Sequence, residues 1–466
     1  MQYIFVALGF MGLLGFMIIK PKFQVLIALV IMTQGFDLAP SLLFNQLIWD
    51  YGAVLLFIPA IRLFLSKKNE SVKPVIYSNL LKVYIIWMFL SLIWSIVIYG
   101  YPALTSIKVA RVMIIGTFIY FIFLRLYQVD KYAFQFFMNM MYLITYVLLI
   151  LSVIQFVFHV KIFSGLITTY GNEQRYLPVF LPICLFYLWN ICARLLSSEK
   201  VQSHALLYVV LTFFITAMTF TRGIYLSVFL IFLLMIFLLV KNQKLRMPAV
   251  MMFLVSVVLM LTAVVMSGYF DQVINRAMSG ISLVTSGTMN QNSENHDADT
   301  FTGRRELVKE RFMMALDKNP LFGYGFIHEN AISEPLRNSL KYGSIINTAE
   351  YAEKYAYGHP YVTAFYSADI GWGDMIMKTG IVGFLIFIFF FIFMFMNYIK
   401  EKKINKGYYY SRLAFFLQAN MMFLLMFNGN PYVGLAVQLP FYLIAGYTYT
   451  SQIRDEANIH KLIFEK

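Results

Sequence analysis

Apolar runs long enough to cross a lipid bilayer recur along almost the whole chain. A helix needs about 20 apolar residues to cross roughly 30 Å of hydrocarbon, and about thirteen such runs follow one another here, separated by short polar connectors. Of the 466 residues, 60% are hydrophobic and only 13% are charged, which is far from the composition of soluble globular proteins. The sequence therefore predicts an all-α, polytopic bundle of about 12–13 transmembrane helices.

The net charge of +14 raises the question of a nucleic-acid partner, and the positions of the charges answer it. Lysine and arginine gather in alternate connectors, on what we name the basic side of the membrane; the other side is named the loop side. The basic side holds Lys20, Lys22, Arg62, Lys67, Lys68, Lys73, Arg125, Lys131, Arg194, Lys200, Lys241, Lys244, Arg246, Lys400, Lys402, Lys403 and Lys406. By the positive-inside rule this side is cytoplasmic, so the charge indicates membrane orientation and no nucleic acid.

With this orientation, one connector on the loop side is far longer than the others. We predict transmembrane spans with short connectors over 1–267, a large extracytoplasmic loop over 268–374, further spans over 375–450 and a cytoplasmic tail over 451–466. Both cysteines, Cys184 and Cys192, fall inside one predicted span, which argues against a disulfide framework and against a cysteine metal site.

The large loop is predicted to be partly helical. Its stretch "SGTMNQNSENHDADTFT" has too few apolar residues to form a core. The following stretch, "GRRELVKERFMMALDKNPLFGYGF", has apolar residues at helical spacing, and the helix should end by "DKNP" because proline disfavours helix in the residue before it. Arg304 and Arg311, seven residues apart, then share one face of this helix.

Arg222 lies on the loop side, between a span at 204–219 and a returning span at 223–240. Its guanidinium is always protonated and offers donors in a planar fork that fits a phosphate. The hydroxyls of Thr219 and Thr221 would add donors. The sequence thus predicts an anion-binding site, although a lone arginine can also reach up to lipid headgroups.

Further cations are predicted at the same level of the membrane. Lys108 and Arg111 lie on one helical face near the loop side, Asp50 lies at matching depth in another span, and Arg175 precedes a span on that side. The loop itself contributes Arg304, Arg305 and Arg311. Each of these residues could instead form a structural ion pair. Together they predict a surface that would bind a pyrophosphate on a lipid carrier.

Three motifs resemble those of the O-antigen ligase and polymerase family. They are "TFTRGIYL" at 219–226, "TGRRELVKERFMMALDKNPLFGYGF" at 302–326, and "DIGWGDMIMKTGIVGFLIFI" at 369–388, where a Gly-x-x-Gly opens the next span. The resemblance covers roughly residues 100–400. It implies an enzyme that takes a glycan from an undecaprenyl-diphosphate carrier and passes it to an acceptor hydroxyl outside the cytoplasmic membrane of a bacterium, with no metal and no nucleotide sugar as cofactor.

The resemblance also implies site residues. Arg222 and Arg304 match the arginines that bind or activate the diphosphate. Lys108, Arg111, Arg175, Arg305 and Arg311 are candidate binding residues for the diphosphate or glycan from their charge and position alone. His359 is the nearest match to the family's loop histidine, but it is followed by proline and lies further upstream than in ligases. Asp369, in "SADIG", resembles the polymerase branch more closely.

Transfer also needs a general base, and arginine cannot serve because it keeps its proton near neutral pH. We predict His359 or Asp369 for this role. His328, Glu306 and Glu329 remain alternatives. Asp369 could instead cap the helix that follows it, since aspartate is a preferred N-cap residue.

Three function classes compete. We favour a metal-independent glycosyltransferase that polymerises lipid-linked repeat units of an O-antigen, capsule or exopolysaccharide, with a ligase of the same family as the alternative; a chain-length regulator and a flippase are possible partners. A flippase of the lipid-linked oligosaccharide would not need the large loop and would be expected to carry inverted repeats. A metal-dependent transferase would be expected to show paired acids in its first outer loop, where only Asp37 is present. Besides these enzymes and the transporter, a non-enzymatic scaffold is the third class.

Overall fold

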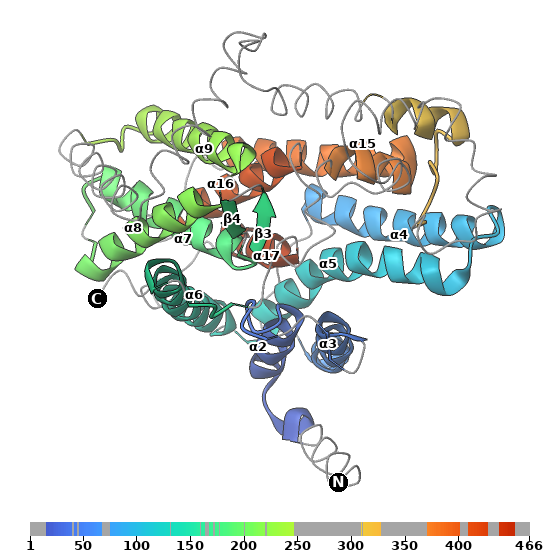
Figure 1. Cartoon of the computed structure of the whole chain (residues 1–466). Helices are drawn as coiled ribbons and strands as arrows, with labels where there is room; N and C mark the ends of the chain where they lie inside the picture. Colours follow the sequence, from blue (N-terminus) through green and yellow to red (C-terminus); the bar gives the residue numbers. More distant parts are fainter. Residues whose placement is uncertain are drawn as a thin grey trace.

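The computed structural model describes residues 15–39, 42–43, 46–67, 75–130, 132–158, 160–163, 167–170, 173–176, 178–199, 201–219, 221–246, 309, 311–327, 371–400, 409–426 and 438–452. Figure 1 shows a bundle of helices. The labelled helices are α2 (Pro21–Met32), α3 (Ile48–Leu65), α4 (Ile76–Val97), α5 (Ala103–Val129), α6 (Ala133–Phe158), α7 (Leu181–Leu196), α8 (Ser203–Met218), α9 (Arg222–Lys241), α15 (Gly371–Lys400), α16 (Tyr409–Leu425) and α17 (Gln438–Gln452).

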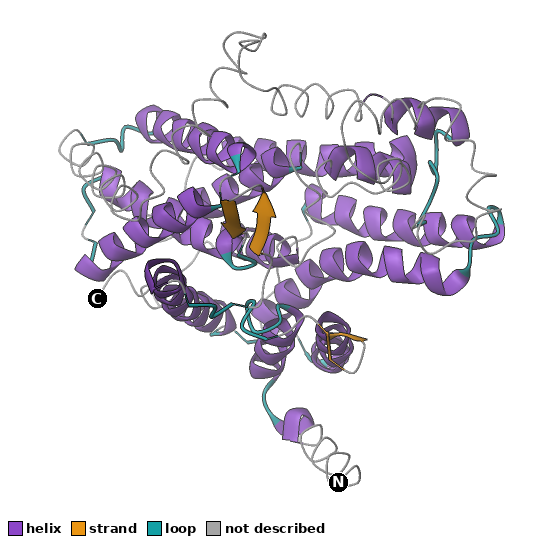
Figure 2. Cartoon of the chain, viewed as in Figure 1, coloured by secondary structure: helices purple, strands orange, loops and turns teal. Residues whose placement is uncertain are grey.

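Six of these helices are long and apolar enough to cross a membrane, namely α3, α4, α5, α6, α9 and α15, and three shorter apolar helices are α2, α7 and α8. The predicted all-α, polytopic membrane fold is therefore confirmed. Two small antiparallel hairpins, which the sequence did not predict, lie in connectors: β1 (Leu42–Leu43) pairs with β2 (Gln46–Leu47), and β3 (Ile167–Tyr170) pairs with β4 (Glu173–Tyr176). Figure 2 shows how little of the described chain they form.

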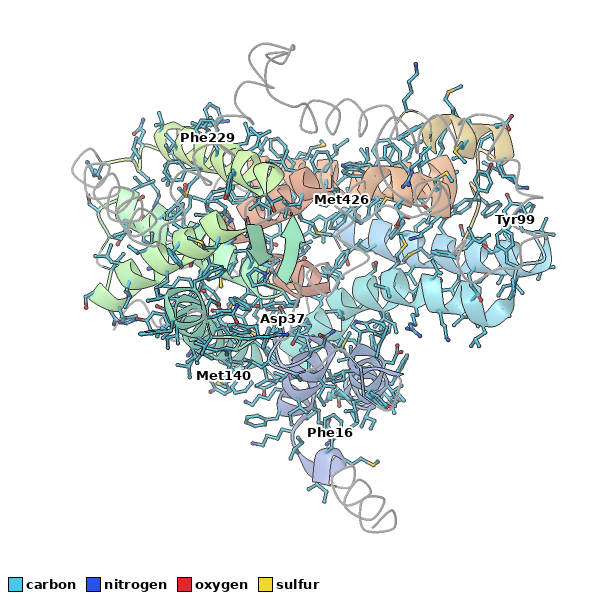
Figure 3. The ribbon with its side chains drawn as sticks, viewed as in Figure 1. Phe16, Asp37, Tyr99, Met140, Phe229 and Met426 are labelled. Atoms are coloured by element: carbon cyan, nitrogen blue, oxygen red, sulfur yellow. The ribbon has the colours of Figure 1, made fainter. Side chains whose placement is uncertain are left out.

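The segment between α2 and α3 is irregular, as its glycine and proline predict. Four consecutive residues, 34–37, have positive φ, so the chain leaves the helix after Met32 and makes a compact turn. Asp37 in this turn is buried, and its carboxylate accepts a hydrogen bond from the Val179 N–H over 3.1 Å. Burial raises the pKa of the Asp37 carboxyl, and the Val179 N–H opposes this rise. Asp37, labelled in Figure 3, thus ties the turn to the start of α7.

Helices α3 and α5 run in the same direction and are joined at both ends. Near their N-terminal ends, the Arg111 guanidinium lies 3.1 Å from the Asp50 carboxylate. At their far ends, the Arg125 guanidinium donates to the carbonyls of Leu63 (2.9 Å) and Ser66. These carbonyls belong to the group that a helix leaves without internal partners at its C-terminus, so Arg125 caps α3 from a neighbouring helix.

The remaining helices enclose a core rich in aromatic residues. Helix α4 packs on α5 and α15, while α16 packs on α7, α9, α15 and α17. Two tyrosines of this core share one hydrogen-bond partner: the Tyr77 hydroxyl lies 3.0 Å from Thr448 Oγ1, as does the Tyr120 hydroxyl. The two tyrosines lie on α4 and α5, so Thr448 of α17 links both helices at their basic-side ends.

Helix α15 is broken at Gly380, which has φ 65° and ψ −172°. The break divides it into a short arm (residues 371–379) and a long arm (residues 381–400). The Trp372 ring lies 5.5 Å from the Phe384 ring and 6.2 Å from the Phe387 ring. In a straight helix, residues 372 and 387 would be about 22 Å apart along the axis. The short arm therefore bends back, so that Trp372 rests against the long arm.

Candidate functional site

The part of the large loop that the structure describes next to α15 is a helix followed by a tight turn. Residues 311–318 are helical and the helix ends at Lys318, as "DKNP" predicts. The Asn319 side-chain carbonyl accepts hydrogen bonds from the N–H groups of Leu321 (2.9 Å) and Phe322 (3.2 Å), which is the local pairing that makes asparagine a turn residue. In Figure 1 this helix, coloured gold, lies beside one end of α4 and α15.

The turn docks on the short arm of α15. The Met377 carbonyl accepts hydrogen bonds from the N–H groups of Tyr324 (2.8 Å) and Gly325 (3.2 Å), and the Ile381 N–H donates to the Pro320 carbonyl (2.9 Å). The last carbonyls of a helix have no partners inside it. The loop turn supplies those partners at the place where α15 breaks.

Glycine is required where the two segments meet. Gly380 has a positive φ, and a Cβ there would overlap the Leu321 carbonyl. Gly323 also has a positive φ, and a Cβ there would lie 2.5 Å from the Met377 carbonyl oxygen. The backbones of the turn and of α15 approach too closely for any side chain, so the two glycine-containing motifs fit one another directly.

Aromatic side chains of α4 enclose the turn. The Phe322 ring stacks between the rings of Trp87 (4.7 Å) and Trp94 (4.6 Å). The Trp87 indole N–H also donates to the Thr379 carbonyl (2.8 Å), and the Tyr99 hydroxyl donates to the Gly323 carbonyl (2.8 Å). Figure 3 shows Tyr99 at this end of the molecule. The outer end of α4 thus holds both the loop turn and the short arm.

Arg222 is the first residue of α9 and follows the short turn predicted between the two spans. Its side chain lies outside the part of the chain that the structure describes. The first turn of α9 holds no acidic residue. The hydroxyls of Thr219 and Thr221 donate to the carbonyls of Thr216 (2.7 Å) and Thr219 (2.8 Å), so the expectation that they serve as donors to an anion is wrong for this arrangement, because both protons are already used within the turn.

Arg111 and Asp50 were predicted to lie at the same depth, and their ion pair confirms it. The Arg111 guanidinium also lies over the Trp49 ring, 5.6 Å from its centroid. Arg111 thus forms an ion pair within the fold, which is the alternative to ligand binding that the sequence left open. Lys108, one turn earlier on α5, is exposed.

The other predicted binding residues lie in different settings. Arg175 is part of β4, in register with Thr168, and its side chain lies outside the described residues. Arg311 is completely buried at the start of the loop helix, where the sequence predicted a face shared with Arg304. Its role in binding a diphosphate stays a prediction. Arg304, Arg305, His359 and Asp369, together with the alternatives His328, Glu306 and Glu329, lie outside the described residues.

The structure adds a charged pair that the sequence analysis missed. Lys378 Nζ lies 2.6 Å from the Asp374 carboxylate within the short arm, and only 2% of the Asp374 side chain is exposed. The spacing of four residues, with the acid first, is the usual sequence signal for a helical ion pair. That signal was present in "GDMIMKTG", but this stretch was interpreted as the exit of the loop.

These features define a class of protein: a multi-pass helical membrane protein in which one long connector docks back on a broken helix. Residues 207–388 match the family model described as O-antigen ligase. In this segment the chain is similar to the O-antigen ligase/polymerase family, whose members are membrane glycosyltransferase-like enzymes. A search of curated proteins found no match.

The matched segment contains the elements just described. It includes the start of α9 with Arg222, the loop helix with its turn, and the break of α15 at Gly380. The family resemblance inferred from three separate motifs is therefore confirmed, and two of those motifs are in direct contact in the folded chain.

Proposed function

We propose that this protein polymerises glycan repeat units, by transferring a glycan from an undecaprenyl-diphosphate carrier to a sugar hydroxyl of an acceptor chain. The observation that carries the proposal is the coincidence of the family match with the docked turn. The match to a family of glycan-transfer enzymes spans Arg222 and the turn at 319–325. The turn is held against α4 and α15 by hydrogen bonds and by close glycine contacts.

The chemistry assigns a task to each predicted residue. The acceptor oxygen forms a bond to the anomeric carbon, the bond from that carbon to the diphosphate oxygen breaks, and the carrier diphosphate leaves with the electron pair. Arg222 and Arg304 stabilise the charge that grows on the diphosphate, because a preorganised cation is most effective where charge develops. The acceptor proton passes to His359 or Asp369.

The position of Arg222 supports this assignment. The N-terminus of a helix carries a partial positive charge, so a cation in its first turn is unfavourable unless an anion is nearby. Arg222 begins α9, and that first turn holds no acidic side chain to balance it. A diphosphate bound there would be stabilised by both the guanidinium and the helix N-terminus. Lys108, Arg111 and Arg175, with Arg305 of the loop, would extend the binding surface toward the glycan. Arg311 is completely buried, so it would contribute to this surface only through its charge.

A ligase is the second candidate, because the matching family model is described as O-antigen ligase. In that reaction the same bond to the diphosphate breaks, and the acceptor is a lipid-anchored glycan instead of a growing chain. The polymerase is preferred because "SADIG" resembles the polymerase branch and His359 departs from the histidine pattern of ligases.

Location follows from the charge pattern. With the basic side in the cytoplasm, the loop side faces outside the cytoplasmic membrane, where a flippase would deliver the lipid-linked repeat unit. A chain-length regulator is a further partner of such a polymerase. No metal is required by the proposed chemistry, since arginine takes the place of a cation on the diphosphate.

Deleting the gene and sizing the surface polysaccharide tests the proposal. Loss of a polymerase leaves single repeat units on the acceptor, whereas loss of a ligase leaves full-length chains on the carrier lipid. Restoring the gene should restore the polymer. An unchanged polysaccharide, with no accumulation on the carrier, would contradict both forms of the proposal.

A further inference from the structure

The short arm of α15 is buried along its whole length, although it carries two charged side chains. Every residue from 371 to 379 is buried, including Asp374 and Lys378. Their ion pair measures 2.6 Å, and the fully buried Tyr84 of α4 lies within electrostatic range of Asp374. Surface ion pairs contribute little to a fold, whereas removing one partner of an enclosed pair leaves an uncompensated buried charge.

The pair makes the short arm electrically neutral. Asp374 lies in the first turn of α15, where the helix dipole favours an acid, and Lys378 follows four residues later, where the two side chains meet. Removing one partner would leave a single buried charge, which is strongly unfavourable, whereas replacing both with apolar residues is often neutral. The short arm should therefore depend on the balance of the two charges more than on either side chain alone.

The short arm also holds the part of the large loop that the structure describes, residues 311–327. The Met377 carbonyl, next to Lys378, accepts two N–H groups of the loop turn, and the Trp87 indole binds the Thr379 carbonyl. If the short arm leaves its place, the turn loses these partners and the loop helix is released from the end of α4. The described residues of that helix follow Arg304 and Arg305, which the proposed reaction uses, by only a few positions in the chain.

We propose that Asp374 and Lys378 are a pair of positioning residues for glycan transfer: their mutual neutralisation keeps the short arm in the bundle, and the short arm holds the loop helix in register with α4. The inference rests on the proposed function for its catalytic consequence. Neither side chain is assigned a chemical step, and the pair acts through the Met377 carbonyl and the Gly380 break.

A distance measurement tests the positioning directly. Asp317→Cys on the loop helix and Ile98→Cys at the end of α4 introduce two exposed label sites, while the native Cys184 and Cys192 are completely buried. Spin labels at the two sites should give one narrow distance distribution in the otherwise unchanged protein. Asp374→Leu alone, or Lys378→Met alone, should broaden it, because the turn is released.

The double variant Asp374→Leu/Lys378→Met tests whether the balance of the two charges, and not either side chain alone, holds the loop helix in place. It removes both charges, so it should restore the narrow distribution and most of the kcat for transfer from a lipid-diphosphate-linked repeat unit. Each single variant should lose at least tenfold in kcat per folded molecule. Lys82→Met, which removes an exposed lysine of α4, is the matched control and should change neither reading.

Several outcomes would overturn the inference. A double variant with the normal distance but without activity would mean that one of the two side chains acts chemically. Single variants with an unchanged distance would mean that the pair does not hold the loop. The double variant keeps the test decisive even if the single variants are not recovered from the membrane. An unchanged protein that transfers no glycan would contradict the proposed function, while the distances would still decide the positioning.

Discussion

Arginines on the basic side of the molecule and cations on the loop side are placed differently with respect to the helices. On the basic side, Arg62 donates to the carbonyls of Met17 and Ile19 (both 2.9 Å), at the end of the helical residues 15–18. Arg125 does the same for α3, and Arg412 donates to the Thr450 carbonyl of α17 over 3.0 Å. Each of these arginines meets the C-terminal end of a helix.

On the loop side, cations lie at the other ends of helices. Arg222 begins α9, and Lys108 and Arg111 lie in the second and third turns of α5. A helix C-terminus attracts a cation and a helix N-terminus repels one. The basic-side arginines therefore stabilise the fold without any ligand, whereas Arg222 at the start of α9 needs an anion. Arg111 has a partner in Asp50, and we infer that the diphosphate is the anion at Arg222.

The largest effect is expected at Arg222. Arg222→Lys keeps the charge but loses the planar fork, so transfer should fall on the order of 100-fold. Polymer length on the cell surface and transfer by the purified protein are the measurements. Arg246→Lys, an exposed position on the basic side, is the control and should behave like the unchanged protein. Normal polymer from a normally expressed Arg222→Lys variant would mean that Arg222, like the basic-side arginines, does not bind the diphosphate.

A substitution of Arg125 should lower stability and leave transfer unchanged, the reverse of the expectation for Arg222. Arg125→Met removes the cap of α3 and should cost about 2 kcal/mol in the free energy of unfolding, since hydrogen bonds from a charged group are lost. Transfer per folded molecule should not change. Thermal unfolding in detergent, with activity normalised to folded protein, measures both. Lys241→Met, in the exposed last turn of α9, should change stability by only about 0.5 kcal/mol or less. Loss of activity without loss of stability at Arg125 would count against a purely structural role.

The smallest effect is expected at the pair of Asp50 and Arg111, which is partly exposed. A double-mutant cycle with Asp50→Asn and Arg111→Gln should give a coupling energy below about 1 kcal/mol. If Arg111 also binds substrate, Arg111→Gln alone should raise KM for the lipid-linked substrate, and Asp50→Asn should not. Equal KM values for the two variants would limit Arg111 to the ion pair.

Features set by a single proline or glycine were predictable. The helix at 311–318 ends where Pro320 requires it, and the long arm of α15 begins directly after Gly380, the first glycine of the Gly-x-x-Gly that was expected to open the next span. The short turn between α8 and α9 also lies where the apolar runs leave a gap. In each case the signal is local, because backbone restriction at one residue decides where an element stops.

Features set by contacts between distant residues were not predictable in this way. The return of the short arm depends on Trp372 meeting Phe387, and its capping depends on Tyr324 meeting the Met377 carbonyl. Periodicity shows which residues are apolar, but it does not show that a charged pair such as Asp374 and Lys378 will be enclosed. The hydroxyls of Thr219 and Thr221 were misjudged for a similar reason, since their partners are carbonyls of the turn itself.

The stack of Phe322 between Trp87 and Trp94 has an optical consequence. The chain contains five tryptophans, and this stack shields two of them at the point where the loop meets the bundle. Indole emission moves to longer wavelength when water reaches the ring. Native fluorescence of the unlabelled protein therefore reports, in real time, whether the loop turn stays docked on α4 or is released when a lipid-linked substrate is added.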